Sequence, residues 1–230
     1  MNVSLVIPIL NEKHNIIKLI KLIQKSLKGL VYEIIFVDDD SLDGTSDVIK
    51  KNKNKKINFY IRKKKPDLTQ ACLFGIRKAK YNYVVIMDGD LQHHPKYILK
   101  FLQTIKNKKI DIVVGARDFT KRNQLSMVRY FSSRLLIFII NIFLGYKSSD
   151  PMSGYFLIKK NIFKKYQTKM YGKGYKILFD IIYSARDSLI TKDITIKFYK
   201  RFRDKSKMSF KILFHVINSF FLKLLNFSKI

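Results

Sequence analysis

Short, uniformly apolar runs alternate with longer segments whose apolar side chains recur every three or four positions through the first half of the chain. Uniform apolar runs bounded by polar turns are typical of buried strands, and the second spacing is typical of amphipathic helices. We expect strands at 3–8, 33–37, 57–61, 83–87 and 110–114, and helices at 12–27, from about 45, at 68–80 and at 96–105. This alternation predicts an α/β fold, with a mostly parallel sheet and helices on both faces.

The second half contains two apolar segments of different kinds. Residues 135–144 are almost wholly apolar but fall short of the ~20 residues that a membrane-spanning helix needs. In residues 210–230, polar side chains such as Lys211, His215 and Asn218 form one stripe on an otherwise apolar helix. This pattern predicts either a helix lying in a membrane interface or an ordinary core or dimer helix. We therefore divide the chain into a main domain at 1–207, which includes a helix at about 123–145, and an amphipathic helix at 208–230.

The formal net charge of +29 and the single cysteine narrow the functional classes. A strongly basic chain attracts an anionic partner, either a membrane leaflet or nucleic acid, although a solvated lysine-rich surface explains the same composition. Cys72, the only cysteine, excludes an internal disulfide and a cysteine-based zinc site and favours a reducing compartment. The chain opens directly into a strand without a signal-peptide pattern, so we expect it to begin in the cytoplasm.

Two carboxylates, Asp88 and Asp90, follow the apolar run at 83–87. Ligands of open α/β sheets bind at the carboxyl ends of the strands. Two neighbouring oxygen donors there suit a divalent cation that keeps open positions for substrate phosphates. The alternative is an Asp-Gly-Asp turn that ends the strand for local backbone reasons. His93, close by, is interpreted as a turn residue or a further ligand.

A second acidic cluster, at 38–43, follows the strand at 33–37. Closely spaced carboxylates repel each other unless hydrogen bonds or a cation compensate, so these residues indicate a binding site. Asp43 could cap the next helix, whereas Asp38 and Asp39 could accept hydrogen bonds from a ribose or a base. Glu12 ends the first strand at the same edge and adds a carboxylate beside this pocket.

Taken in order, these motifs resemble the inverting family 2 glycosyltransferases of the GT-A fold, the family that includes dolichol-phosphate mannose synthases. The segments that carry the resemblance are Pro8 to Glu12, Val37 to Thr45, Met87 to Pro95, Asp150 to Tyr155, Gly174 to Leu178, and Arg201 with Ser206 and Lys207. The resemblance covers about residues 2 to 210, and it implies a GT-A domain, Rossmann-like, over residues 1–207.

The resemblance also assigns roles to residues. It implies that the nucleotide sugar contacts Pro8, Asn11, Glu12, Asp38, Asp39, Asp88, Arg201 and Lys207. It implies that Asp88, Asp90 and Gln92 hold Mg²⁺ or Mn²⁺, and that Arg117, Arg129 and Ser133 bind the acceptor phosphate. Asp90, Arg117 and Asp150 form the catalytic group.

Arginine suits forked recognition of phosphate, and Arg129 and Ser133 are four residues apart, on one face of a helix. A basic helix face beside lipid headgroups is the other interpretation of this helix. A phosphomonoester is already largely dianionic near neutral pH, since its second pKa is ~6, so it needs no protein base to attack a sugar. The following apolar run would then hold the tail of a lipid phosphate.

These expectations combine into a metal-dependent transferase that moves mannose from GDP-mannose to a polyprenyl phosphate at the cytoplasmic face of a membrane. The enzyme would be peripheral or monotopic, and a separate membrane-spanning partner could recruit it. The alternatives are a UDP-sugar donor with the same lipid, and a soluble sugar hydroxyl as acceptor with Asp150 as general base. Acidic residues at three strand ends argue against nucleic acid as a partner.

Overall fold

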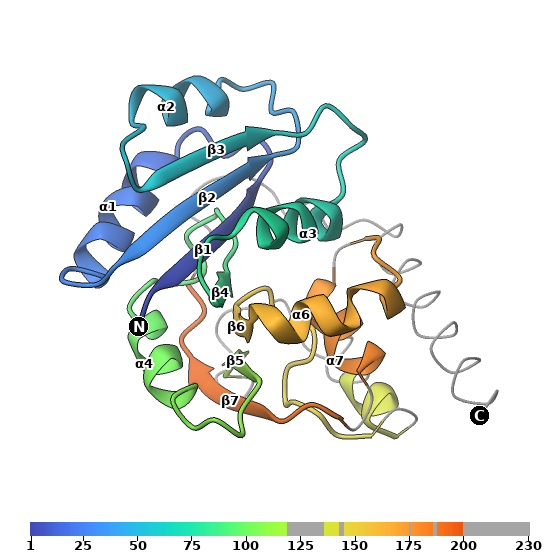
Figure 1. Ribbon diagram of the computed structural model, residues 1–230. Coiled ribbons are helices and arrows are strands. Elements are labelled where there is room, and N and C mark those ends of the chain that lie inside the picture. Colours follow the sequence, from blue (N-terminus) through green and yellow to red (C-terminus); the bar gives the residue numbers. More distant parts are fainter. Residues whose placement is uncertain (119–135, 143–144, 175, 186–187, 200–230) are drawn as a thin grey trace.

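The central element of the computed structural model is a seven-stranded sheet with the order β3-β2-β1-β4-β6-β5-β7 (Figure 1). The structure describes residues 1–118, 136–142, 145–174, 176–185 and 188–199. The strands are β1 (Val3–Ile9), β2 (Tyr32–Asp38), β3 (Ile57–Ile61), β4 (Tyr83–Ile86), β5 (Ile112–Arg117), β6 (Phe156–Lys159) and β7 (Thr191–Ile196). Of these strands, β6 alone runs against its neighbours, so the sheet is mostly parallel, as the sequence predicts.

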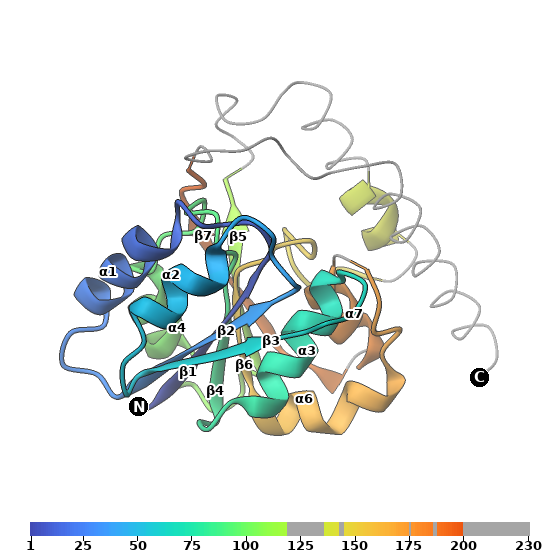
Figure 2. The ribbon, with the colours of Figure 1, turned by 90° about the horizontal axis from the view of Figure 1, so that it is seen from above.

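Helices cover both faces of the sheet (Figure 2). One face carries α1 (Ile16–Ser26), α2 (Thr45–Lys51) and α4 (Tyr97–Thr104), and the other carries α3 (Leu68–Lys78), α6 (Lys160–Tyr166) and α7 (Ile177–Ser184). A short 3₁₀ turn, Gln167–Lys169, follows α6. In α1 the buried positions are Ile16, Leu19, Ile20 and Ile23, the apolar stripe that the sequence pattern predicts. The sheet therefore separates two apolar cores, one under each helical layer.

The expected elements of the first half are confirmed, with shifts at their ends. The first helix begins at Ile16 rather than at residue 12, because the chain around Glu12 is held in a loop. The Glu12 backbone N–H donates to Thr45 Oγ1 at 2.9 Å, and the Glu12 carboxylate accepts from Asn15 Nδ2 at 2.6 Å. The fifth strand runs from Ile112 to Arg117 instead of 110–114, so Arg117 ends a strand.

The second half agrees only in part with the sequence expectations. Residues 136–142, within the helix expected at about 123–145, are helical, and Ile140 is buried in the core. The remainder of that helix and the amphipathic helix expected at 208–230 lie outside the described residues. Within the described ranges, no helix is long and apolar enough to cross a membrane.

The topology brings distant segments to one edge of the sheet. In the parallel pairing of β1 with β2, Ile9 lies opposite Asp38, and β4 runs in the same direction on the other side of β1. Because β6 is antiparallel to both β4 and β5, those two strands also point the same way. Glu12, Asp39, Asp88 and Arg117 therefore all follow or end strands at the same edge, where α/β folds bind ligands.

Candidate active site

Asp38 is buried and its carboxylate is used within its own loop. One oxygen accepts from the backbone N–H of Ser41 at 3.0 Å and from its hydroxyl at 2.5 Å, and the other accepts from Ser46 Oγ at 2.6 Å. The segment after β1 is joined to this loop, because the Asn11 N–H donates to Ser41 Oγ and Asn11 Oδ1 accepts from the Leu42 N–H. Asp38 and Asn11, both expected to contact the nucleotide sugar, thus shape the pocket wall. Pro8, another expected contact, lies in β1 one residue before its end.

Asp39 lies in a charged network that the sequence did not reveal. Its carboxylate makes an ion pair with Arg62 and accepts from the Asp67 N–H at 2.8 Å. Burial raises the pKa of Asp39, and the hydrogen bond from Asp67 and the charge of Arg62 offset part of that effect. The sequence could have pointed to Arg62 only through its position directly after β3, which places it at the same sheet edge as Asp39.

The expected metal-binding residues lie in a tight turn after β4. Asp90 is 4% exposed and accepts from Gln92 N–H at 3.1 Å, while Leu91 between them has a φ of 65°. A leucine in the left-handed region is strained, and such strain is concentrated at functional sites. Gln92 Nε2 donates to the Tyr199 carbonyl at 3.1 Å, which ties this turn to the segment after β7.

The carboxylate of Asp88 lies against Gly154, where a Cβ would be only 2.6 Å from Asp88 Oδ2. The absence of a side chain at 154 thus leaves space for this carboxylate, whose side chain is one-third exposed. Among the described residues, no group of three or more histidine, cysteine or acidic side chains is placed to hold a metal. Two carboxylates with an amide oxygen nevertheless fit Mg²⁺ or Mn²⁺, because Mg²⁺ keeps several water and phosphate ligands.

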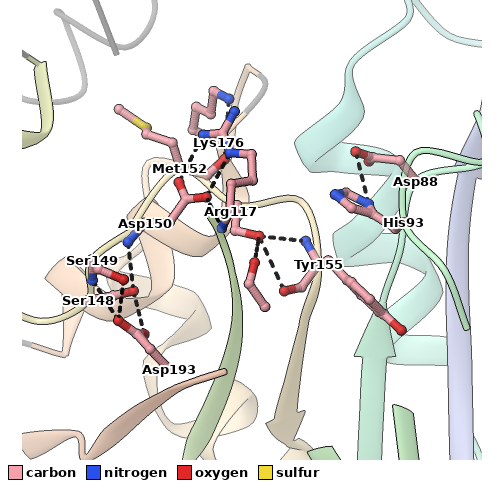
Figure 3. Close-up of polar contacts among 12 residues, drawn as sticks. Asp88, His93, Arg117, Ser148, Ser149, Asp150, Met152, Tyr155, Lys176 and Asp193 are labelled. Atoms are coloured by element: carbon pink, nitrogen blue, oxygen red, sulfur yellow. Dashed lines mark hydrogen bonds and ion pairs between the residues drawn. The ribbon is translucent and has the colours of Figure 1, made fainter. Parts of the chain in front are cut away.

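His93, interpreted from the sequence as a turn residue or a further ligand, is buried at the end of this turn. Its ring is 2% exposed, stacks on Tyr155 with centroids 5.0 Å apart, and has Nδ1 3.5 Å from Asp88 Oδ2 (Figure 3). Burial lowers its pKa to about 4, so the imidazole is neutral at physiological pH. The neutral ring packs between Tyr155 and the Asp88 carboxylate.

Arg117 and Asp150 form a forked ion pair at the end of β5. Arg117 Nε donates to Asp150 Oδ2 at 2.7 Å, Nη2 donates to Oδ1 at 2.9 Å, and the Arg117 backbone N–H donates to Oδ2 at 3.2 Å (Figure 3). Asp150 is fully buried, and both of its oxygens accept hydrogen bonds from Arg117. Burial alone would lower the pKa of Arg117, but the Asp150 charge outweighs it and raises that pKa.

Lys176 joins this pair, although the sequence assigned it no role. It precedes α7, is partly buried, and donates from Nζ to the Met152 carbonyl at 3.3 Å (Figure 3). Burial and the neighbouring Arg117 charge lower its pKa to about 8. The signal available in the sequence was its position in the segment Gly174 to Leu178.

Four of the expected site residues, Arg129, Ser133, Arg201 and Lys207, lie outside the described residues. In Figure 3, Asp88 lies with His93 on one side of Tyr155, and Arg117 lies with Asp150 and Lys176 on the other. Cys72 is buried as expected, and burial raises its pKa well above its ordinary value, so it is a core residue.

Comparison with known proteins identifies the class to which this fold and site belong. Residues 4–167 match the family described as Glycosyl transferase family 2. The chain belongs to this family. A dolichol-phosphate mannosyltransferase of Pyrococcus furiosus is 32% identical over 223 residues, which are 94% of this chain and 62% of the relative. A second protein of that name, from Mycosarcoma maydis, is 28% identical over 92% of this chain and 75% of its own length.

Solved structures give the fold. Glucosyl-3-phosphoglycerate synthase from Mycobacterium tuberculosis, in complex with UDP, superimposes with a TM-score of 0.70 at 19% identity. The match covers 98% of this chain and 79% of the synthase. The same synthase has been solved with Mn²⁺, UDP-glucose and phosphoglyceric acid, with a TM-score of 0.70 at 18% identity. The fold is therefore GT-A, as the sequence predicts. The chain spans 62% of the length of the Pyrococcus relative, so the activity of that whole protein is not assigned to this chain by the similarity.

Proposed function

We propose that this glycosyltransferase inverts the sugar configuration while moving one hexose, mannose from GDP-mannose, onto a polyprenyl phosphate at the cytoplasmic face of a membrane. Similarity to two dolichol-phosphate mannosyltransferases supports the choice of donor and acceptor. The observation that carries the proposal is the forked ion pair of Asp150 with Arg117.

This ion pair favours a phosphate acceptor over a hydroxyl acceptor. A hydroxyl acceptor needs a general base within hydrogen-bond reach, and Asp150 was the residue expected to act as that base. In the structure both Asp150 oxygens accept from Arg117, and the carboxylate is fully buried. A phosphate acceptor is already ionised and needs a fixed cation instead of a base. Asp150 is then a positioning residue, and Arg117 is the group that contacts the acceptor.

On the donor side, the nucleoside would lie against the loops that follow β1 and β2. Asp39 and Glu12 border this pocket, and Arg62 holds the Asp39 carboxylate in place. Asp88, Asp90 and Gln92 would hold Mg²⁺ or Mn²⁺, which when bound stabilises negative charge on the departing nucleoside diphosphate. The buried, neutral His93 keeps water away from one side of Asp88.

The proposed reaction is a single displacement. An oxygen of the acceptor phosphate forms a bond to the anomeric carbon, and the bond from that carbon to the nucleoside diphosphate breaks with its electron pair. Attack opposite to the departing group inverts the anomeric configuration. Arg201 and Lys207 are proposed to contact the donor phosphates, and Arg129 and Ser133 the acceptor phosphate. Tyr199, two residues before Arg201, is joined to the turn after β4, because its N–H donates to the Gln92 carbonyl and its carbonyl accepts from Gln92 Nε2.

The test is transfer of radiolabelled sugar from GDP-mannose, UDP-glucose and UDP-N-acetylglucosamine to polyprenyl phosphate in lipid vesicles, with and without Mg²⁺ or Mn²⁺. We expect metal-dependent lipid product from GDP-mannose. Product from a UDP-sugar instead would correct the donor and leave the acceptor in place. Product only with soluble hydroxyl acceptors would overturn the proposal. Activity that requires added membrane extract would point to a separate membrane-spanning partner.

Membrane attachment is a separate part of the proposal, and it rests on residues 208–230. Deletion of this segment is expected to reduce transfer in vesicles while sparing transfer to a short, detergent-soluble prenyl phosphate. Equal activity of the full and shortened chains on both acceptors would reject a membrane role for this segment.

A further inference from the structure

Lys176 is a partly buried cation whose position the proposed donor and acceptor contacts do not explain. Among the described residues, its ammonium group makes one hydrogen bond, to the Met152 carbonyl. An ammonium group has three N–H donors, so this bond leaves donors for another acceptor. Burial disfavours the charged form of a lysine unless an anion is nearby. Asp150, whose charge raises the pKa of Lys176, already accepts from Arg117 with both oxygens.

Hydrogen bonds hold the backbone at three residues shortly before Lys176. The Asp180 carboxylate accepts from the backbone N–H groups of Tyr171 at 2.9 Å and Gly172 at 2.7 Å. Asp67 Oδ2 accepts from Gly174 N–H at 2.8 Å, and the Gly174 carbonyl accepts from Thr69 N–H at 2.9 Å. Support of this kind close to a side chain reduces the freedom that is lost when a ligand binds.

Charge explains what the ligand must be. Arg117 and Lys176 bring two positive charges to one place, and Arg117 contributes to the lowered pKa of Lys176. Asp150 makes a forked contact with Arg117, and the charges of Asp150 and Asp88 both raise the pKa of Lys176 and so offset part of this effect. Lys176 lies with Arg117 in Figure 3, on the side of Tyr155 away from Asp88 and the metal turn. An anion bound there would relieve the repulsion between the two cations and satisfy the remaining ammonium donors.

We infer that Lys176 binds the acceptor phosphate together with Arg117 and thereby sets the affinity of the enzyme for phosphate acceptors. This assignment rests on the proposed function and adds to it a residue with a defined ligand. Arg117 supplies a planar guanidinium that Asp150 already engages, whereas Lys176 supplies a point charge that makes one hydrogen bond among the described residues. The donor diphosphate is the other phosphate source at this edge, and the test separates the two.

The experiment compares Lys176→Met, Lys176→Arg and Lys173→Met with the wild type in the full chain. Lys173 is exposed in the same segment, three residues away, and provides the matched control. Steady-state kinetics are measured with varied polyprenyl phosphate and with varied nucleotide sugar, and hydrolysis of the nucleotide sugar is measured without acceptor. Lys176→Met should lower kcat/KM for the lipid phosphate roughly 10- to 100-fold, the range for loss of one charge-assisted hydrogen bond. Its KM for the nucleotide sugar and its hydrolysis rate should stay within about twofold of wild type, and Lys176→Arg should recover part of the loss.

Three results would overturn the assignment. Equal kinetics of Lys176→Met and Lys173→Met would show that the ammonium group is not used. A matched rise in KM for the nucleotide sugar, with slower hydrolysis, would place Lys176 on the donor diphosphate. An absence of transfer to lipid phosphate by the wild type would reject the proposed function and this assignment with it, a result distinct from a failure of the variants alone.

Discussion

Two parts of the sheet edge hold their charged side chains in different ways. In the proposed donor half, formed by the loops after β1, β2 and β4, Asp38 and Asp90 accept hydrogen bonds from neighbours close in sequence, although Asp39 pairs with the more distant Arg62. The proposed acceptor half, formed by Arg117, Asp150 and Lys176, joins residues that are 33 positions apart in the case of the ion pair. Local hydrogen bonds thus contribute to the first half, whereas the second depends on a long-range ion pair.

The difference has a functional meaning. The loop after β2, closed by its own hydrogen bonds, presents a preformed surface that suits a nucleoside, while Asp88 and Asp90 supply negative charge for the proposed metal. The proposed acceptor half brings Arg117 and Lys176 together, and an anion bound there would stabilise their charged forms, which suits a phosphate. Activity should therefore depend on metal binding and on side-chain shape in the proposed donor half, and on side-chain charge in the proposed acceptor half.

The largest expected effect is in the donor half. Asp90→Ala removes a buried oxygen ligand of the proposed metal, so kcat/KM should fall roughly 100-fold or more. Transfer assays over a range of Mn²⁺ concentrations provide the measurement. Asp47→Ala, an exposed acidic residue of α2, is the control and should retain wild-type activity. Unchanged metal dependence in Asp90→Ala would remove Asp90 from the metal site.

Breaking the ion pair is the next largest change. Asp150→Ala leaves the Arg117 guanidinium largely buried without its partner, which should cost about 3 kcal/mol of unfolding free energy. Chemical denaturation measures this cost, and a double-mutant cycle with Arg117→Met should show strong non-additivity. The activity of Asp150→Asn discriminates between the roles of Asp150. A general base would add an acidic limb to the wild-type pH profile that the variant lacks, whereas a positioning residue would change the rate at every pH.

The same contrast explains what the sequence could predict. The strands of the donor half are uniformly apolar runs, and their polar ends are read directly from the chain, so Asp39, Asp88 and Asp90 were found at their correct edge. The loop contacts of Asp38 could not be predicted, because an aspartate that holds a loop and one that binds a ligand have the same sequence pattern. In the structure both Asp38 oxygens accept hydrogen bonds within the loop, and its expected contact with the nucleotide sugar stays a prediction.

The acceptor half could not be derived from local patterns. Its geometry depends on β6, a four-residue antiparallel strand that inserts between β4 and β5. Nothing in so short an apolar run reveals its direction or its neighbours. Arg117 and Asp150 were identified through family resemblance, but their pairing was not. Lys176 needed the fold, because its environment comes from Met152 and Arg117, far away in the chain.

A smaller effect is expected from adding one methyl group beside Asp88. In Gly154→Ala the new Cβ would lie 2.6 Å from Asp88 Oδ2, so the carboxylate must move. We expect the apparent Mn²⁺ affinity to fall about tenfold, with activity restored by excess Mn²⁺. Gly89→Ala is the matched control, since its Cβ would meet the Ile9 methyl group at 2.8 Å instead of a carboxylate. That variant should lose stability through overpacking. Equal Mn²⁺ affinities in both variants would contradict a special role for Gly154.

The smallest expected effect is a dependence of stability on pH that arises from Lys176. Its pKa is about 8 in the folded chain and should return to its ordinary value, near 10.5, on unfolding. Between these values the unfolded chain binds more protons at this residue, so folding becomes more favourable as pH rises. Unfolding free energies of wild type and Lys176→Met are therefore compared at pH 7 and pH 9.5. The wild type should gain on the order of 1 kcal/mol relative to the variant at the higher pH.

The same comparison in the presence of a short prenyl phosphate sharpens the contrast between the two halves. A bound anion raises the pKa of Lys176 toward its ordinary value, so the relative gain should shrink. A gain that persists unchanged with the phosphate present would show that Lys176 does not sense the anion.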